Sequence, residues 1–219
     1  MSKRKPIKKY YFTVEGETEK WYLDWLKGKI NECEESVCIV SIDAPVQKNP
    51  LKRAKSLSVI GKTEIWHLSD YESNDQIHVK QFTETIDNMN EANELGKQII
   101  YKFGYSNFTF DLWIILHKID CNSSYTHRKN YIEPLNRAYG ESFENMDEYK
   151  HEKNFKRCLS KLTLENVKDA INRANKIMKN NKENGYRLCQ YKGYNYYKEN
   201  PSLAIQEIIE KMLKDCKLI

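Results

Sequence analysis

Short apolar runs alternate with longer amphipathic segments through the first half of the chain. Four runs are rich in aromatic and β-branched residues, which is typical of buried strands. They lie at residues 10–14, 37–42, 64–68 and 98–103. Three segments between them place apolar side chains on one helical face and cover residues 18–30, 49–61 and 80–96. This alternation predicts an α/β fold with a mostly parallel four-stranded sheet flanked by helices.

The second half of the chain has a different pattern. Apolar runs and stripes at helical spacing predict helices at residues 110–118, 163–178 and 200–212. Polar stretches predict loops at residues 119–130 and 180–200. We therefore expect an α/β domain over residues 1–118. A helical carboxyl-terminal region, residues 119–219, is expected to pack on it.

Composition favours a soluble protein of ordinary size. The 219 residues are long enough to bury one core, and 40% of them are hydrophobic and 31% charged. No apolar run approaches the roughly 20 residues that a membrane span requires. Five of the first nine residues are basic with no apolar stretch among them, which does not fit a secretory signal. The expected location is therefore the cytoplasm.

Cysteine and histidine spacing argues against a zinc site. The six cysteines form no C-x-x-C pair and the five histidines form no H-x-x-x-H pair. Net charge is +5, a mild excess that permits nucleic acid as a partner without requiring it.

Carboxylates follow two of the predicted strands. Glu15 comes directly after the first strand, where Gly16 allows a tight turn, and Asp70 and Glu72 follow the third. The carboxyl ends of parallel strands open onto the crevice where ligands bind. Residues two apart on an extended segment point to the same side, so Asp70 and Glu72 could share one cation. Oxygen ligands suit Mg²⁺ or Mn²⁺. Glu17 and Glu19 suit a helix amino terminus instead.

Three segments resemble one known family. "VEGETEKWY", "WHLSDYE" and "SNFTFDLWIILHK" resemble the RloB family, which includes the second component of the AbiL abortive-infection system and is similar to Toprim-type nucleases. The resemblance covers nearly the whole chain. It implies a Toprim-like fold in which Glu15 and Asp70 occupy metal-site positions. Glu72 stands where the family has aspartate, and Asp111 stands where it has glutamate.

The resemblance also implies a function. It implies a metal-dependent nuclease that acts in antiphage abortive infection, with Mg²⁺ or Mn²⁺ as cofactor and a partner ATPase. RNA, including tRNA, is favoured over DNA as the substrate by analogy with other defence effectors. Association with a second copy of the chain is compatible with the sequence.

Two further residues are candidates for the site. Lys20 follows the first turn of a predicted helix and could contact phosphate, or it could be an ordinary solvated lysine. His117 closes the third motif and could be either catalytic or a buried, hydrogen-bonded histidine. Asp111 and His117 are separated by about 240° on a helix, so both cannot face one site unless the helix breaks. The role of Asp75 is open.

Two other classes of function stay open. The chain could be a catalytically inactive module that binds nucleic acid or a phage protein, and the change to Glu72 favours that alternative. It could also be a nucleotidyl transferase, although no G-x-x-x-x-G-K-[ST] loop is present. The basic and aromatic residues at 186–198 could stack on single-stranded nucleic acid or pack onto the sheet.

Overall fold

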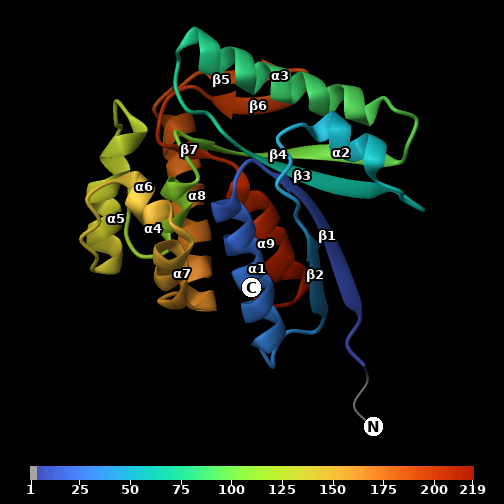
Figure 1. Cartoon of the computed structure of the whole chain (residues 1–219), viewed down its shortest axis with the longest axis horizontal. Coiled ribbons are helices and arrows are strands. Elements are labelled where there is room, and N and C mark those ends of the chain that lie inside the picture. The colour runs from blue at the N-terminus through green and yellow to red at the C-terminus, as the bar shows by residue number, and fades with distance from the viewer. Residues whose placement is uncertain (1–3) are drawn as a thin grey trace.

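A mixed sheet of five strands forms the centre of the molecule (Figure 1). The computed structural model describes residues 4–219, so the start of the basic amino-terminal run lies outside it. The strand order is β2-β1-β3-β4-β7. The strands are β1 (Ile7–Val14), β2 (Ile39–Asp43), β3 (Thr63–Asp70), β4 (Ile99–Asn107) and β7 (Ser202–Leu203). β1 to β4 pair in parallel, and β7 is antiparallel to β4.

The α/β class is confirmed, but the prediction of a four-stranded sheet is wrong because β7 adds an antiparallel fifth strand. The sequence predicts a helix from residue 200, whereas Ser202 and Leu203 pair with the end of β4. The Asn107 side-chain amide donates to the carbonyls of Tyr197, Lys198 and Glu199. These bonds tie the segment before β7 to β4, so tertiary pairing overrides the local helix signal.

Helices connect the strands and form most of the second half. Three helices follow the first three strands, and their bounds are α1 (Glu17–Glu32), α2 (Pro50–Ser56) and α3 (Gln76–Asn93). The later helices are α4 (Asp111–Leu116), the 3₁₀ helix η1 (Arg128–Tyr131), α5 (Ile132–Tyr139), α6 (Met146–Lys150), α7 (Glu152–Ser160), α8 (Leu164–Glu183) and α9 (Ile205–Asp215). No helix within residues 4–219 is both long and apolar enough to cross a membrane.

A separate hydrophobic core lies on each face of the sheet. α1 and α9 lie on one face, and α2 and α3 lie on the other (Figure 1). Alternate side chains of β3 enter the two cores, because successive residues of a strand point to opposite faces. Trp66 and Leu68 pack with α1 and α9, whereas Ile65 packs with α3. Residues beyond 118 contribute β7 and α9 to the sheet and its cover.

A two-stranded hairpin replaces the loop predicted at 180–200, which corrects that prediction. Its strands are β5 (Leu188–Tyr191) and β6 (Tyr194–Tyr197). Lys192 and Gly193 have φ values of 49° and 85°, the left-handed backbone that a tight hairpin turn requires. Tyr196 is buried against Phe82 with ring centroids 4.9 Å apart. This tyrosine therefore packs the hairpin onto the helix-covered sheet rather than offering an open stacking surface.

Candidate functional site

Glu15 and Asp70 meet at the carboxyl edge of the sheet. Glu15 follows β1 and Asp70 ends β3, and these two strands are parallel neighbours. The Ser69 hydroxyl donates to Glu15 Oε1 at 2.8 Å, and the Asp70 N–H donates to Glu15 Oε2 at 3.5 Å. The structure therefore brings together these two residues from separate sequence motifs.

Glu19 joins them from the first turn of α1. Its side chain is buried, and its Oε2 accepts a hydrogen bond from the Thr18 hydroxyl at 2.9 Å. A Cβ atom at Gly16 would lie 2.9 Å from this oxygen, so glycine leaves room for the carboxylate to fold back over the turn. The sequence predicts only a helix-dipole role for Glu19, whereas the structure buries it beside the other acids.

Asp111 and Lys150 complete the group. Asp111, the first residue of α4, is 1% exposed, and its Oδ2 lies 3.0 Å from Lys150 Nζ at the end of α6. The Thr109 hydroxyl donates to the same oxygen at 2.8 Å, and Asp111 Oδ1 is buried without a hydrogen-bond partner. The Phe110 N–H donates to Asp70 Oδ1 at 2.8 Å, which joins the start of α4 to β3. We call these five residues the acid cluster: Glu15, Glu19, Asp70, Asp111 and Lys150.

The acids of the cluster perturb one another. Burial and the neighbouring carboxylates of Glu19 and Glu15 raise the pKa of Asp70 well above its usual value, although Lys150 opposes the shift. Burial also raises the pKa of Glu19. The carboxylate of Asp111 is the main cause of a raised Lys150 pKa. The cluster therefore holds more carboxyl groups than its one lysine can neutralise, and Asp70 and Glu19 keep their protons to higher pH than exposed acids do.

Glu15 differs from its neighbours because polar groups surround it. Burial acts to raise the pKa of Glu15, but His67, the Ser69 hydroxyl and the Asp70 N–H outweigh it, so the pKa is lowered. His67 Nε2 lies 3.8 Å from Glu15 Oε1, and Nδ1 lies 2.7 Å from the Thr13 hydroxyl. The environment of Glu15 therefore favours its charged form.

The Glu72 side chain pairs with Arg128 and His78 and makes no hydrogen bond or ion pair with the acid cluster in the described residues. Glu72 Oε2 is 3.0 Å from Arg128 Nη1 and 3.5 Å from His78 Nε2, in a pocket that Asp75 also lines. We call Glu72, His78 and Arg128 the Glu72 group. The sequence predicts that Asp70 and Glu72 point to the same side of an extended segment and share one cation. However, β3 ends at Asp70, so the alternation of side chains along a strand does not extend to Glu72.

Lys20 and His117 also lie apart from the cluster. Lys20 Nζ is 3.7 Å from Glu17 Oε2, and both side chains are largely exposed. His117 is fully buried, donates from Nδ1 to the Trp113 carbonyl at 2.8 Å and accepts from the Tyr22 hydroxyl at 3.1 Å. Burial lowers the His117 pKa to about 3, so the ring is neutral. Its surroundings are those of a hydrogen-bonded core histidine.

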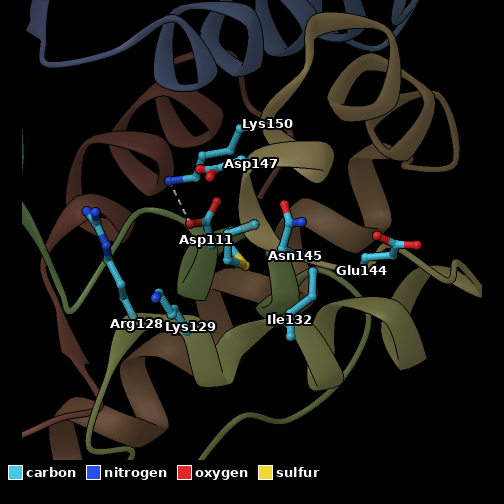
Figure 2. A pocket seen from close by; sticks show the side chains of 9 residues that line it. Asp111, Arg128, Lys129, Ile132, Glu144, Asn145, Asp147 and Lys150 are labelled. Atoms are coloured by element: carbon cyan, nitrogen blue, oxygen red, sulfur yellow. Dashed lines mark ion pairs between the residues drawn. The ribbon is translucent and has the colours of Figure 1, made fainter.

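A pocket of about 570 Å³ opens beside the cluster (Figure 2). Asp111 and Lys150 form one wall of it, and the other lining residues are Arg128, Lys129, Ile132, Glu144, Asn145, Met146 and Asp147. Figure 2 shows Arg128 and Lys129 on one side of Asp111 and Glu144 on the other. We call this the Lys150 pocket. The cluster thus adjoins a cavity large enough for a small ligand.

The donor set of the cluster fits a hard divalent cation in its chemistry. All of its ligand atoms are carboxylate oxygens, one of which lacks a partner, and the crowded negative charge would be offset by a cation. Within residues 4–219, no group of three or more His, Cys, Asp or Glu side chains converges in a way that could hold a metal ion. Holding a cation would therefore require these carboxylates to turn toward a common point.

Several residues of the site were not predicted from the sequence. Lys150 lies in no sequence motif. Glu19 lies within "VEGETEKWY", but the sequence predicts only a helix-terminus role for it, and the fold brings both residues to the strand ends. Asp111 was noted only through the family resemblance. His67 did carry a signal, since it is a titratable residue within the apolar run of β3.

Fold and site together define an α/β protein with a buried carboxylate cluster at the carboxyl edge of a mostly parallel sheet. The chain belongs to the RloB-like protein family, whose family model matches residues 10–212. No curated protein and no solved structure is similar enough to count as a match.

Proposed function

We propose that this protein is a metal-dependent nuclease of an antiphage abortive-infection system, related to the Toprim-type nucleases. The observation that carries the proposal is the acid cluster, in which carboxylates from β1, β3, α1 and α4 crowd at one edge of the sheet. Glu15 after the first strand and Asp70 after the third are the positions at which Toprim-like sites place their acids. Membership of the RloB-like family agrees with this proposal.

Mg²⁺ or Mn²⁺ would be held by Glu15, Asp70 and Asp111. When bound, the cation supplies Lewis-acid stabilisation of charge on a phosphodiester. Lys150 is placed to offset further negative charge on the phosphate from the Asp111 side of the cluster. The Ser69 hydroxyl holds Glu15 in position through its hydrogen bond to Oε1, and His67 Nε2 lies 3.8 Å from the same oxygen. Glu72, Lys20 and His117 have no contact with the reacting groups in this proposal.

RNA is the proposed substrate, with tRNA among the candidate targets and DNA as the competing one. The defence setting and a partner ATPase that restrains or triggers the enzyme rest on the family resemblance. Association of two copies of the chain is compatible with the proposal, and the chemistry of one cluster does not depend on it.

The test is cleavage of total RNA, single-stranded DNA and plasmid DNA in Mn²⁺ or chelator by the wild type, Glu15→Gln and Glu17→Gln. Glu17 is the matched control, because it lies two residues away and its side chain is 53% exposed. We expect metal-dependent cleavage of RNA by the wild type and by Glu17→Gln, and none by Glu15→Gln. Equal cleavage by both variants would contradict the proposed site.

One observation favours a second candidate function. Within the described chain no three potential ligands converge on one point, and Glu72 is paired with Arg128 instead. A binding module that recognises nucleic acid without cutting it would keep the fold and would not need its carboxylates to converge on a cation. Absence of cleavage on every substrate, with retained RNA binding and no response to Mn²⁺, would support this alternative.

A further inference from the structure

The Lys150 pocket has a basic side that the proposed chemistry does not use. Arg128 and Lys129 project from η1 toward the pocket that Asp111 and Lys150 border (Figure 2). Arg128 is half-exposed, and its only described ion pair is the exposed contact with Glu72. Exposed pairs contribute little free energy, so a phosphate could replace Glu72 as the partner of this guanidinium.

A buried acceptor in the wall of the pocket lacks a partner. Asp111 is 1% exposed, and its Oδ1 accepts no hydrogen bond from any described residue although Oδ2 is bonded twice. Buried polar atoms are rarely left unpaired, and an exception calls for a ligand, ion or water that completes the set. This atom is therefore open to the proposed cation, at the border between the pocket and the acid cluster.

The rest of the lining is suited to a nucleoside. Ile132 and Met146 supply apolar surface for the face of a base, and Asn145 and Glu144 line the same pocket. Neither Glu144 nor Asp147 forms an ion pair with any residue from 4 to 219, so their carboxylates are available to accept from hydroxyl groups. Acidic side chains are suited to bind ribose 2′-hydroxyls, which RNA has and DNA lacks.

We infer that the Lys150 pocket binds one unpaired nucleotide of an RNA strand, with a phosphate on Arg128 and Lys129 and the base against Ile132 and Met146. The inference rests on the proposed function in that it makes the pocket the substrate subsite of the acid cluster. The adjacent phosphodiester would then lie near Asp111 and Lys150, the two residues of the acid cluster that line the pocket. A paired base cannot enter such a pocket without leaving its stack, so the subsite selects single-stranded segments.

The experiment measures binding of a short labelled single-stranded RNA in chelator, where the proposed hydrolysis does not run. It compares the wild type with Arg128→Gln, Lys129→Gln, their double variant and Lys168→Gln. Lys168 is the matched control, because it is a basic residue of α8 paired with Glu165 and does not line the pocket. The three substituted side chains are accessible, so none of the four variants is expected to be impaired in folding, which a melting curve verifies.

We expect each pocket substitution to weaken binding roughly tenfold, since a charge-assisted hydrogen bond is lost. The slope of log affinity against log salt should fall by about 0.7 for each contact removed, while Lys168→Gln changes neither quantity. The double variant binding as tightly as Lys168→Gln, or no RNA binding by the wild type, would overturn the inference. DNA of the same sequence should bind more weakly, and equal affinity would overturn the assignment of the acids to the 2′-hydroxyl.

The two proposals can fail separately. RNA binding that depends on Arg128 and Lys129, without cleavage in Mn²⁺, would keep the subsite and contradict the nuclease. Cleavage that persists with unchanged KM in the double variant would keep the nuclease and contradict the subsite.

Discussion

Asp70 and Glu72 are two residues apart in the chain, yet they belong to different surroundings. Asp70 is the last residue of β3 and touches Glu15 and the start of α4. Glu72 lies in the following loop and pairs with Arg128 and His78. Between them, Tyr71 donates its N–H to the Ser106 carbonyl and buries its ring against Phe82. Two acids that are two residues apart therefore face the same side only where both belong to the strand, and Glu72 lies beyond the end of β3.

Replacing Asp70 should have the largest effect on cleavage. Asp70→Asn removes one ligand charge from the acid cluster while keeping the shape of the side chain. We expect cleavage to fall by about a hundredfold to a thousandfold, because a metal ion contributes several kcal/mol of transition-state stabilisation. Initial rates on RNA in saturating Mn²⁺ measure the effect. A rate within a few-fold of the wild type would place the chemistry elsewhere.

Replacing Lys150 tests the charge balance of the cluster. Lys150→Met keeps the length of the side chain and leaves the buried Asp111 without its cation. The expected loss in the free energy of unfolding, in chelator, is about 1–3 kcal/mol, moderated because Lys150 is 35% exposed. Urea denaturation measures the loss.

The matched control for Lys150 is the double variant Asp111→Asn, Lys150→Met, which removes both charges. It should lose less free energy of unfolding than Lys150→Met, because no uncompensated charge remains. Equal losses would show that the ion pair does not set the stability of this region.

The contribution of Asp70 and Glu19 to the stability of the metal-free protein should fall as pH rises. The pKa values of Asp70 and Glu19 are raised in the folded protein, so the unfolded chain releases these protons first. Above the ordinary carboxyl pKa of about 4, the folded state binds more protons than the unfolded state, and stability falls with rising pH until the raised pKa values are passed. Across this range the urea midpoint of the wild type should therefore fall relative to that of Asp70→Asn, which lacks the Asp70 proton. The same pH dependence of the urea midpoint in both proteins would contradict the raised pKa of Asp70.

The smallest effect is expected at Glu72. Glu72→Gln removes an exposed ion pair with Arg128, which is worth about 0.2–1 kcal/mol. Cleavage rate and Mn²⁺ affinity should stay close to those of the wild type. A loss as large as that of Asp70→Asn would restore Glu72 to the site and undo the distinction between the acid cluster and the Glu72 group.

Much of the sheet could be predicted from sequence because its signals are local. The runs that became β1 to β4 are apolar and bounded by helical segments, so period and composition identify them. β7 could not be predicted in this way, since Ser202 and Leu203 become a strand only by pairing with Ser106 and Asn107. The hairpin did have a local signal in Lys192 and Gly193, which was outweighed by the polar character of the segment.

The candidate site was predicted where strand ends alone define it. Glu15 and Asp70 follow parallel neighbours, so topology brings them together. Lys150 lies eighty residues from Asp70 on a separate helix, and no spacing in the sequence relates the two. Glu19 was assigned to the helix dipole because its position in the first turn fits that role equally well. Its burial follows from tertiary packing over Gly16.

The most direct test of the account is thermal stabilisation by Mn²⁺ of three proteins: the wild type, Glu72→Gln, and the double variant Glu15→Gln, Asp70→Asn. We expect the wild type and Glu72→Gln to gain stability, by about 2.7 kcal/mol when Mn²⁺ is in hundredfold excess over its Kd. The double variant should gain none. Stabilisation of the double variant, or its loss in Glu72→Gln alone, would contradict the claim that the acid cluster holds the cation.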